Sequence, residues 1–241
     1  MNIIAVIPAR MASTRCPGKP LVELAGKPMV QWVFEAAQHA QVPRCVVIAT
    51  PDQEIVDAAS GFGCEAVLTR SDHRTGTDRI AEVAEMLEAD GYVNVQGDEP
   101  FIEASSIDAC AMPIATGTAQ MASVYDWLTE DDESDPNVVK VVTDNRDRAL
   151  YFSRSMIPYL RGEKARGKKH VGLYAYSRDA LLNFSKWPPT ALELSESLEQ
   201  LRFLENGVGI QMTYAPGTPL AVDTPEQAKQ ASEMLARRSE L

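Results

Sequence analysis

The sequence is poor in the residues that build disulfide frameworks and zinc sites. Only 4 of its 241 residues are cysteine. None of them forms a CxxC pair or a Cys/His pattern with the spacing of metal ligands. We therefore expect these residues to be small buried hydrophobic side chains or thiols without a role. They are Cys16, Cys45, Cys64 and Cys110.

Long apolar runs are also missing. No stretch approaches the roughly 18 apolar residues of a membrane-spanning helix. The apolar residues that follow Met1 are interrupted at Pro8 and Arg10, a pattern that disfavours a secretory signal peptide. We expect a soluble, cytoplasmic protein.

Positive charge is scarce. The chain has 23 Lys and Arg against 34 Asp and Glu, so its formal net charge is -11. This balance argues against a nucleic-acid-binding surface, because phosphate backbones favour basic faces. It is compatible with a small anionic substrate, since a local cluster of cations can outweigh distant negative charge.

The first half of the chain alternates strands with helices. Apolar runs predict buried strands, and apolar residues at helical spacing predict amphipathic helices. The strands are 3–8, 45–50, 65–69 and 91–96, and the helices are 28–40, 52–62 (capped by Asp52) and one around 80–87. Such alternation predicts an α/β fold with a mostly parallel sheet and helices on both faces. No repeat or linker divides the chain, so we predict a single domain over residues 1–241.

The second half is less regular. Its predicted strands are 121–127, 138–143, 149–154, 170–176 and 211–214, some of them separated only by turns. This spacing predicts an antiparallel or mixed extension of the sheet. We expect a loop at 161–169, a helix over about 192–205 and a last helix after Pro225, which suits a first helical position.

A cationic loop follows the first predicted strand. The stretch ARMASTRCPGKP (9–20) contains Arg10, Arg15 and Lys19, together with small residues and prolines that stiffen it. It has neither the GxxxxGK[ST] nor the GxGxxG pattern, so it is not a Walker loop or a dinucleotide fingerprint. A solvated basic loop is the alternative, because Lys and Arg are common on surfaces. In open α/β sheets, however, ligands bind at the carboxyl ends of the strands.

Two acidic loops complete the pattern. Asp98 lies in QGDEP (96–100), directly after a predicted strand, and Asp223 lies in VDTPE (222–226). Taken alone, Asp98 could be a turn residue and Asp223 a helix cap. Together with the cationic loop they fit a nucleoside triphosphate and Mg²⁺, because Mg²⁺ binds through one or two carboxylates plus substrate phosphates.

Eight ordered motifs resemble those of the 3-deoxy-manno-octulosonate (Kdo) cytidylyltransferases, or CMP-Kdo synthetases. They are the loop 9–20, HRTGTDR (73–79), NVQGDEP (94–100), VVKVV (138–142), YFSR (151–154), HVGLY (170–174), LEQLR (198–202) and VDTPE (222–226). The resemblance implies a Rossmann-like nucleotidyltransferase fold and a homodimer. It also implies a reaction in which CTP and Kdo give CMP-Kdo and pyrophosphate for lipopolysaccharide assembly, with Mg²⁺ as cofactor.

The resemblance also implies roles for individual residues. Residues 1–120 would mainly bind CTP, and residues 121–241 would mainly bind the sugar and form the dimer. Lys19, Asp98, Asp223 and Arg15 would be catalytic, the two aspartates as Mg²⁺ ligands. The nucleotide would contact Arg10, Arg15, Lys19, His73, Thr75, Gly76 and Gln96. The sugar acid would contact Arg154, His170, Tyr174, Glu199 and Gln200. We assign no dedicated base and keep His170 as a candidate for one.

The departures from the family pattern lie towards the sugar end. LELSE (192–196) places Leu194 where family members usually carry histidine, and PGTPLAVD (216–223) is longer than the usual approach to the second aspartate. The sugar could therefore be Kdo or its 8-amino derivative. A CMP-sialic acid synthetase lacks the HxxGTDR and YFSR pairing. A CTP-binding protein without activity would not need both Asp98 and Asp223.

Overall fold

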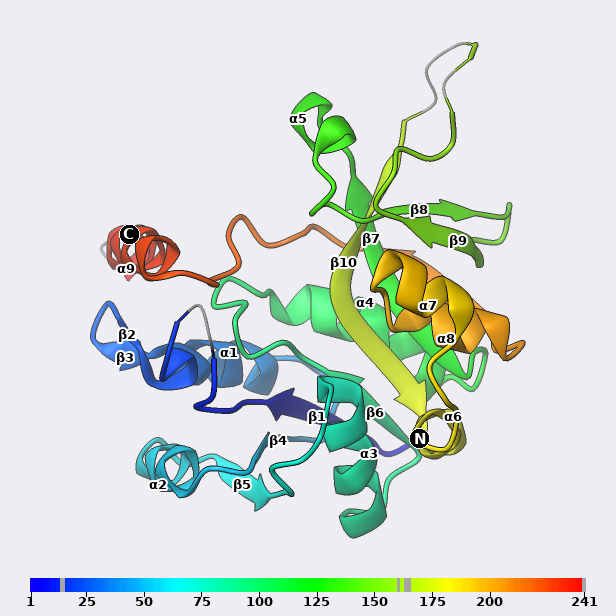
Figure 1. Ribbon diagram of the computed structural model, residues 1–241. Helices are drawn as coiled ribbons and strands as arrows, with labels where there is room; N and C mark the ends of the chain where they lie inside the picture. Colours follow the sequence, from blue (N-terminus) through cyan, green and yellow to red (C-terminus); the bar gives the residue numbers. More distant parts are fainter. Residues whose placement is uncertain (14–15, 160, 163–165, 240–241) are drawn as a thin grey trace.

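A mostly parallel sheet runs through the molecule. The computed structural model describes residues 1–13, 16–159, 161–162 and 166–239 (Figure 1). The main path of the sheet has the strand order β11-β7-β10-β6-β1-β4-β5. These strands are β1 (Ile3–Pro8), β4 (Cys45–Thr50), β5 (Glu65–Leu68), β6 (Gly91–Asn94), β7 (Met121–Trp127), β10 (Lys168–Ser177) and β11 (Ile210–Tyr214).

The direction of these strands confirms the predicted fold class. β1 is parallel to β4 and β6, and β4 is parallel to β5. β10 is antiparallel to both β6 and β7, while β11 is parallel to β7. On the main path, β10 therefore runs against all its companions. The carboxyl ends of β1, β4 and β6 consequently meet at one edge of the sheet.

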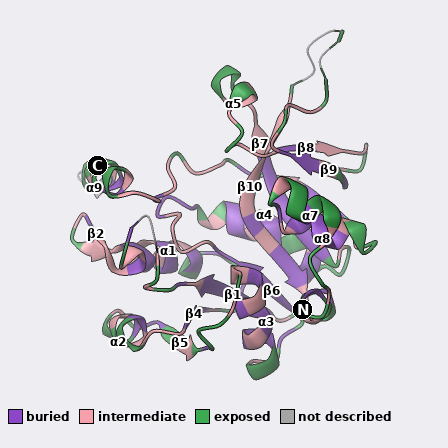
Figure 2. Ribbon diagram, viewed as in Figure 1, coloured by how far each residue is buried: buried purple, intermediate pink, exposed green. Residues whose placement is uncertain are grey.

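Helices cover both faces of the sheet (Figure 2). Side chains alternate along a strand, so the odd-numbered residues of β1 face one layer and the even-numbered residues face the other. One layer holds α1 (Met29–Gln38), α2 (Gln53–Gly61) and α4 (Ala104–Ala115). The opposite layer holds α3 (Gly76–Met86), α6 (Arg178–Phe184) and α8 (Gln200–Glu205).

An antiparallel extension confirms the prediction for the second half. β8 (Lys140–Thr143) pairs with β9 (Ala149–Ser153), and the start of β10 pairs with β8. This extension projects beyond the helical layers, close to the short helix α5 (Glu130–Ser134) (Figure 1). Lys168 and Lys169, which we predicted to lie in a loop, pair with Val141 and Lys140 and so begin β10.

A separate apolar cluster joins the two ends of the chain. It combines the hairpin of β2 (Glu23–Leu24) and β3 (Lys27–Pro28), which follows the η1 turn (Lys19–Leu21), with α9 (Pro225–Ser239). Leu24, Met29, Val222 and Leu235 are buried in it. Figure 1 shows α9 beside the β2–β3 hairpin. This cluster brings the segment before α9 to the loop after β1.

Several expectations need correction. The helix predicted over 192–205 is interrupted: α7 (Ala191–Glu196) ends at Ser197, whose φ is 54°, before α8 begins. We did not predict α4 or α6. Cys16, Cys64 and Cys110 are buried as expected, whereas Cys45 is exposed, because it is the first residue of its strand. Among the described residues, no helix is long and apolar enough to cross a membrane.

Candidate active site

The loop after β1 is held at the carboxyl edge of the sheet. The main-chain N–H of Met11 donates to the carboxylate of Asp52 at 2.7 Å, and Gly18 N–H donates to the carbonyl of Met11 at 3.1 Å. Asp52 precedes α2 as predicted, but its side chain makes no capping bond and instead holds this loop. Arg15, predicted to bind phosphate, lies outside the described residues.

Lys19 bridges the two predicted metal-binding aspartates. It begins the η1 turn after Gly18, whose φ of 70° favours glycine. Its Nζ donates to Asp98 at 2.6 Å and to Asp223 at 3.1 Å. Burial of the ammonium lowers the pKa of Lys19. Asp98 and Asp223 outweigh this effect, so the pKa of Lys19 lies above its ordinary value. Lys19 is therefore a firmly charged cation in this site.

Main-chain bonds bring the aspartates together although they are far apart in sequence. Val222 N–H donates to the carbonyl of Asp98 at 2.9 Å, which places the next residue, Asp223, beside the loop after β6. The Thr218 hydroxyl donates to the Glu99 carboxylate and ties the same two segments a second time. Burial raises the pKa of Glu99 to about 7. The segment that is longer than the family pattern is thus anchored at both of its ends.

Glycine is favoured where these loops cross. A Cβ on Gly97 would lie 3.0 Å from the carbonyl oxygen of Pro8, closer than ordinary van der Waals contact. A side chain at residue 97 would therefore crowd the end of β1, which favours glycine where the loop after β6 approaches it.

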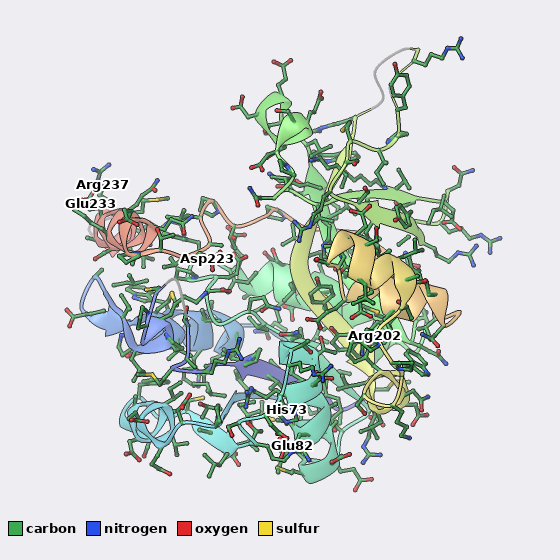
Figure 3. All side chains as sticks on the ribbon, in the orientation of Figure 1. His73, Glu82, Arg202, Asp223, Glu233 and Arg237 are labelled. Carbon is green, nitrogen blue, oxygen red and sulfur yellow. The ribbon has the colours of Figure 1, made fainter. Side chains whose placement is uncertain are left out.

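The amino end of α3 borders the same site. The Thr75 hydroxyl accepts a hydrogen bond from the N–H of Asp78 at 3.1 Å and caps the helix. Figure 3 shows His73 beside Glu82 of α3, to which its Nε2 is hydrogen-bonded. The positive end of a helix dipole attracts anions, so this end of α3 favours phosphate.

Arg79, the last residue of the HRTGTDR motif, is a further cation of this site. It is only 3% exposed, and its guanidinium donates to the Thr69 hydroxyl and to the carbonyl of Arg70. Burial, and then the neighbouring Arg10, lower its pKa, which shows that positive charges are crowded here. Its position in HRTGTDR was the available signal, because the family motif ends on it.

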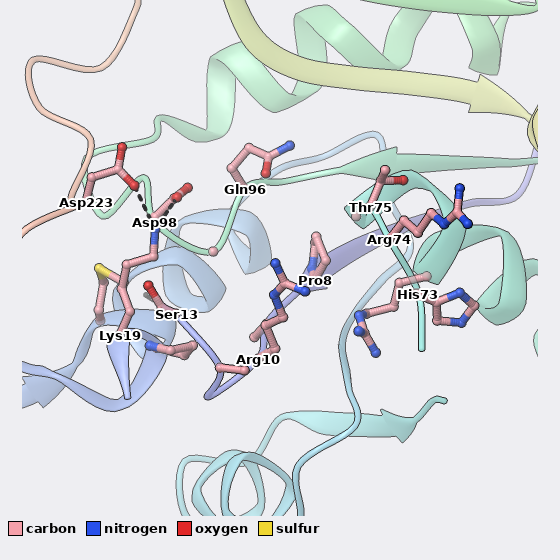
Figure 4. A pocket seen from close by; sticks show the side chains of 17 residues that line it. Pro8, Arg10, Ser13, Lys19, His73, Arg74, Thr75, Gln96, Asp98 and Asp223 are labelled. Carbon is pink, nitrogen blue, oxygen red and sulfur yellow. Dashed lines mark hydrogen bonds and ion pairs between the residues drawn. The ribbon is translucent and has the colours of Figure 1, made fainter. Parts of the chain in front are cut away.

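A cavity of about 370 Å³ joins these parts (Figure 4). Most of the predicted nucleotide and metal residues line it: Arg10, Lys19, His73, Thr75, Gly76, Gln96, Asp98 and Asp223. Arg74 and Arg79 of the HRTGTDR motif also line it, as does Ser13, which was not predicted as a ligand. In Figure 4, Lys19 reaches Asp98 and Asp223 at one end, while His73 and Arg74 lie at the opposite end. The cavity therefore combines a cationic wall with two carboxylates.

A second cavity of about 210 Å³ adjoins the first, and both are lined by Gly76 and Gln96. Of the predicted sugar residues, Tyr174, Glu199 and Gln200 line it. Its other lining residues are mostly small or apolar: Thr77, Asn94, Met121, Tyr176, Ser197, Leu198 and Phe203.

The second cavity depends on the bend between α7 and α8. Buried Arg202 of α8, labelled in Figure 3, donates to the Glu193 carboxylate of α7 at 2.7 Å through Nε. The left-handed conformation of Ser197 then allows the chain to turn between the two helices. Glu199 and Gln200 follow this turn and so reach the cavity. Burial raises the pKa of Glu199, and the Thr77 and Thr75 hydroxyls oppose that effect.

His170 and Arg154 lie outside the residues that line either cavity. The Nε2 of His170 is 2.8 Å from the Ser123 hydroxyl, and burial lowers the pKa of His170 to about 3. Its imidazole is therefore neutral near pH 7. Arg154 donates through Nε to the carbonyl of Glu196 at 2.8 Å, and its N–H donates to the Glu196 carboxylate at 2.9 Å. It thus joins the end of β9 to α7.

Comparisons with known proteins agree with this geometry. The model of the family described as "Cytidylyltransferase" matches residues 4–211. A 3-deoxy-manno-octulosonate cytidylyltransferase of Geobacter sulfurreducens is 49% identical over 255 residues, covering 98% of this chain and all of the relative. One of Acidobacterium capsulatum is 44% identical and covers 99% of this chain and 98% of the relative. The chain belongs to the 3-deoxy-manno-octulosonate cytidylyltransferase family. It is accordingly a nucleotidyltransferase, and the resemblance found in its motifs is confirmed.

Solved structures extend the comparison. The structure of a CMP:2-keto-3-deoxy-manno-octonic acid synthetase complexed with CTP matches with a TM-score of 0.96 at 42% identity, over 99% of this chain and all of the other. A cytidylyltransferase of Leptospira borgpetersenii matches with a TM-score of 0.63 at 14% identity, over 100% of this chain and 96% of the other. The second match shows the shared fold alone.

The departure from the family pattern at Leu194 lies away from both cavities. Leu194 is 67% exposed on α7 and lines neither of them. This member of the cytidylyltransferase family therefore differs from the usual motif at a surface position.

Proposed function

We propose that this chain transfers CMP from CTP to the anomeric hydroxyl of Kdo and releases pyrophosphate. One observation supports this most: Lys19, Asp98 and Asp223 meet at the end of a cationic cavity that adjoins a second, less charged cavity. A triphosphate and a sugar acid need such a pair of neighbouring sites. The names of the relatives supply the identity of the nucleotide and of the sugar.

The first cavity suits the nucleotide. Arg10 and Lys19 would offset charge on the triphosphate, as would Arg15 of the same loop, and the amino end of α3 would add its dipole. His73, Thr75, Gly76 and Gln96 would frame the nucleoside. Lys19 would also stabilise the charge that develops on departing pyrophosphate.

The two aspartates are suited to Mg²⁺. Their carboxylates converge on one ammonium group, an arrangement that supports binding of a compact cation. Among the described residues, no group of three or more His, Cys, Asp or Glu side chains could hold a metal ion. Two carboxylates suffice for Mg²⁺, which keeps several waters and takes further oxygens from phosphates. When bound, Mg²⁺ would neutralise phosphate charge and lower the pKa of the acceptor hydroxyl.

The second cavity suits the sugar. Tyr174, Glu199 and Gln200 would bind its hydroxyl groups and direct the anomeric hydroxyl towards the first cavity across Gly76 and Gln96. His170 would act as a neutral hydrogen-bonding group behind this cavity rather than as a base or a cation. Arg154 would support the cavity through its bonds to α7.

Further parts of the proposal come from the family resemblance. We propose that the product serves lipopolysaccharide assembly in the cytoplasm and that the chain forms a homodimer. We favour Kdo over its 8-amino derivative because the residue that departs from the family motif, Leu194, does not line the second cavity.

A parallel assay tests the substrate. Purified protein with CTP and Mg²⁺ is given Kdo, its 8-amino derivative, sialic acid or no sugar, and pyrophosphate release is followed. We expect fast release with Kdo and a CMP-Kdo product in the mass spectrum. Faster release with the 8-amino derivative or with sialic acid would identify that compound, in place of Kdo, as the preferred sugar substrate. Binding of CTP without release under any condition would favour a CTP-binding protein without activity.

A further inference from the structure

Lys19 and a divalent cation require the same carboxylate oxygens. The Nζ of Lys19 lies 2.6 Å from Asp98 Oδ2 and 3.1 Å from Asp223 Oδ1. A Mg²⁺ ion binds carboxylate oxygens at about 2.1 Å. A divalent ion shared by the two carboxylates would therefore lie against the ammonium, and like charges at that separation repel strongly in a partly buried site.

The position of Lys19 is built into the fold. Its main-chain N–H donates to the carbonyl of Cys16 at 3.1 Å, and its carbonyl accepts from Val22 N–H at 3.2 Å. The next residue, Pro20, is buried, and the side chain of Lys19 is only 17% exposed. On the other side, Val222 is buried in the cluster that includes Leu24 and Met29. One apolar cluster thus packs the hairpin that follows the turn carrying Lys19 against the segment that ends in Asp223.

From this geometry we infer that Lys19 is an internal competitor of the divalent cation, so that free metal binds poorly and enters together with the triphosphate. The inference rests on the proposed function for the identity of that triphosphate. With Lys19 in place, the three side chains together carry a net charge of −1. The two aspartates alone would carry −2 and would attract a divalent cation more strongly. A triphosphate attracts the ammonium away from the carboxylates and supplies oxygens to the metal in the same event.

The arrangement has a consequence for catalysis. A divalent ion bound before the nucleotide would hold water at the reaction centre, and it would have no phosphate oxygens as ligands. Competition by Lys19 disfavours this state. Lys19 therefore has two successive partners: the carboxylates before the nucleotide binds and the phosphates afterwards.

Binding of Mn²⁺ tests the inference without any turnover. Free Mn²⁺ is measured by its electron paramagnetic resonance signal in titrations of the wild type, Lys19→Met and a control, Lys27→Met. Lys27 pairs with Glu35 and lines neither cavity, so its substitution removes the same charge elsewhere. In the absence of nucleotide we expect Lys19→Met to bind Mn²⁺ at least about tenfold more tightly than the wild type and Lys27→Met to be unchanged.

A second titration uses the Mn²⁺–CTP complex. Here Lys19→Met should bind no more tightly than the wild type, because it has lost its contact with phosphate. Addition of Asp98→Asn to Lys19→Met should abolish the gain for free Mn²⁺. Equal or weaker binding of free Mn²⁺ by Lys19→Met would overturn the inference, as would a gain that survives Asp98→Asn.

Two further controls keep the outcomes separate. Lys19→Gln repeats the experiment with a polar side chain, and circular dichroism confirms that each variant is folded. No sugar is present, so a wrong sugar substrate would leave the Mn²⁺ result intact. Conversely, normal pyrophosphate release with unchanged Mn²⁺ binding would refute only the role of Lys19 as a competitor.

Discussion

The two cavities adjoin each other, yet they handle charge in opposite ways. The first is lined by several charged side chains: Arg10, Lys19, Arg74, Arg79, Asp98 and Asp223. In the second, Glu199 is the one acidic or basic side chain among the lining residues that the structure describes, and aromatic rings and amides supply much of the rest. One cavity is therefore suited to neutralising a polyanion, and the other to recognising hydroxyl groups and shape.

Burial reinforces the contrast. In the first cavity, carboxylates keep Lys19 charged despite partial burial. At the second, burial raises the pKa of Tyr174 and of Glu199 and lowers the pKa of His170 behind it. All three shifts favour the neutral form. Charge is thus concentrated in the first cavity, so substitutions in the two cavities should have separable effects.

The largest effect should come from removing a carboxylate in the first cavity. Asp98→Asn keeps the shape of the side chain but halves the charge available to a metal ion. We expect pyrophosphate release to fall by at least about 10³-fold at saturating substrates, because electrostatic stabilisation of the reacting phosphate is lost. Asp57→Asn on α2, whose carboxylate accepts from Gln53 at an exposed position, is the matched control. A loss of less than tenfold for Asp98→Asn would contradict the metal assignment.

A smaller effect should follow loss of Arg10, the cation that we propose contacts only the triphosphate. Arg10→Ala should weaken CTP binding by about 10- to 100-fold, since a charge-assisted contact to phosphate is removed, and leave the KM for Kdo nearly unchanged. Isothermal titration with CTP and steady-state kinetics measure the two quantities. Arg44→Ala, at an exposed position just before β4, controls for the change in net charge. Unchanged CTP affinity in Arg10→Ala would show that the cationic wall does not bind phosphate.

The reverse pattern should appear in the second cavity. Tyr174→Phe removes one hydroxyl group and should raise the KM for Kdo by about tenfold, the cost of a lost hydrogen bond, with CTP affinity unchanged. Tyr214→Phe changes the same group at a half-exposed position and should have no effect. If Tyr174→Phe weakens CTP binding as much as Kdo binding, the two cavities do not bind separate substrates.

The same contrast explains how far the sequence could predict the molecule. Arg10, Lys19 and Asp98 could be grouped because each follows a buried parallel strand, and such strand ends share one edge of a sheet. Asp223 lies well after its preceding strand, β11, which ends at Tyr214. Its approach to Asp98 depends on the Val222 main-chain bond and on the cluster around α9, neither of which leaves a local pattern.

The second cavity was less accessible to prediction. It combines residues of β6, β10 and α8, and its shape requires a left-handed Ser197 between two helices. Periodicity alone predicted one continuous helix there, because serine carries no signal for a positive φ. The roles of Arg154 and His170 also depended on the fold: the YFSR motif holds α7, and His170 packs behind the cavity.

The smallest effect concerns His170, which lies behind the second cavity and is kept neutral by burial. Burial lowers the pKa of His170 to about 3 in the folded protein, whereas the pKa of histidine in an unfolded chain is about 6.5. Below about pH 6.5 the imidazole therefore binds a proton in the unfolded chain but not in the folded protein. The free energy of unfolding consequently falls as the pH falls from about 6.5 towards 3. Between pH 7.0 and 5.5, urea unfolding should show the wild type losing about 1 kcal/mol more than His170→Gln.

The comparison with His170→Gln is informative because other groups titrate equally in both proteins and cancel in the difference. His39→Gln, at an exposed position after α1, should retain the full pH dependence of the wild type. If His170→Gln instead loses as much stability as the wild type over this range, His170 is not kept neutral by burial. The second cavity would then carry a positive charge near the sugar acid, and the separation of charge between the two cavities would have to be abandoned.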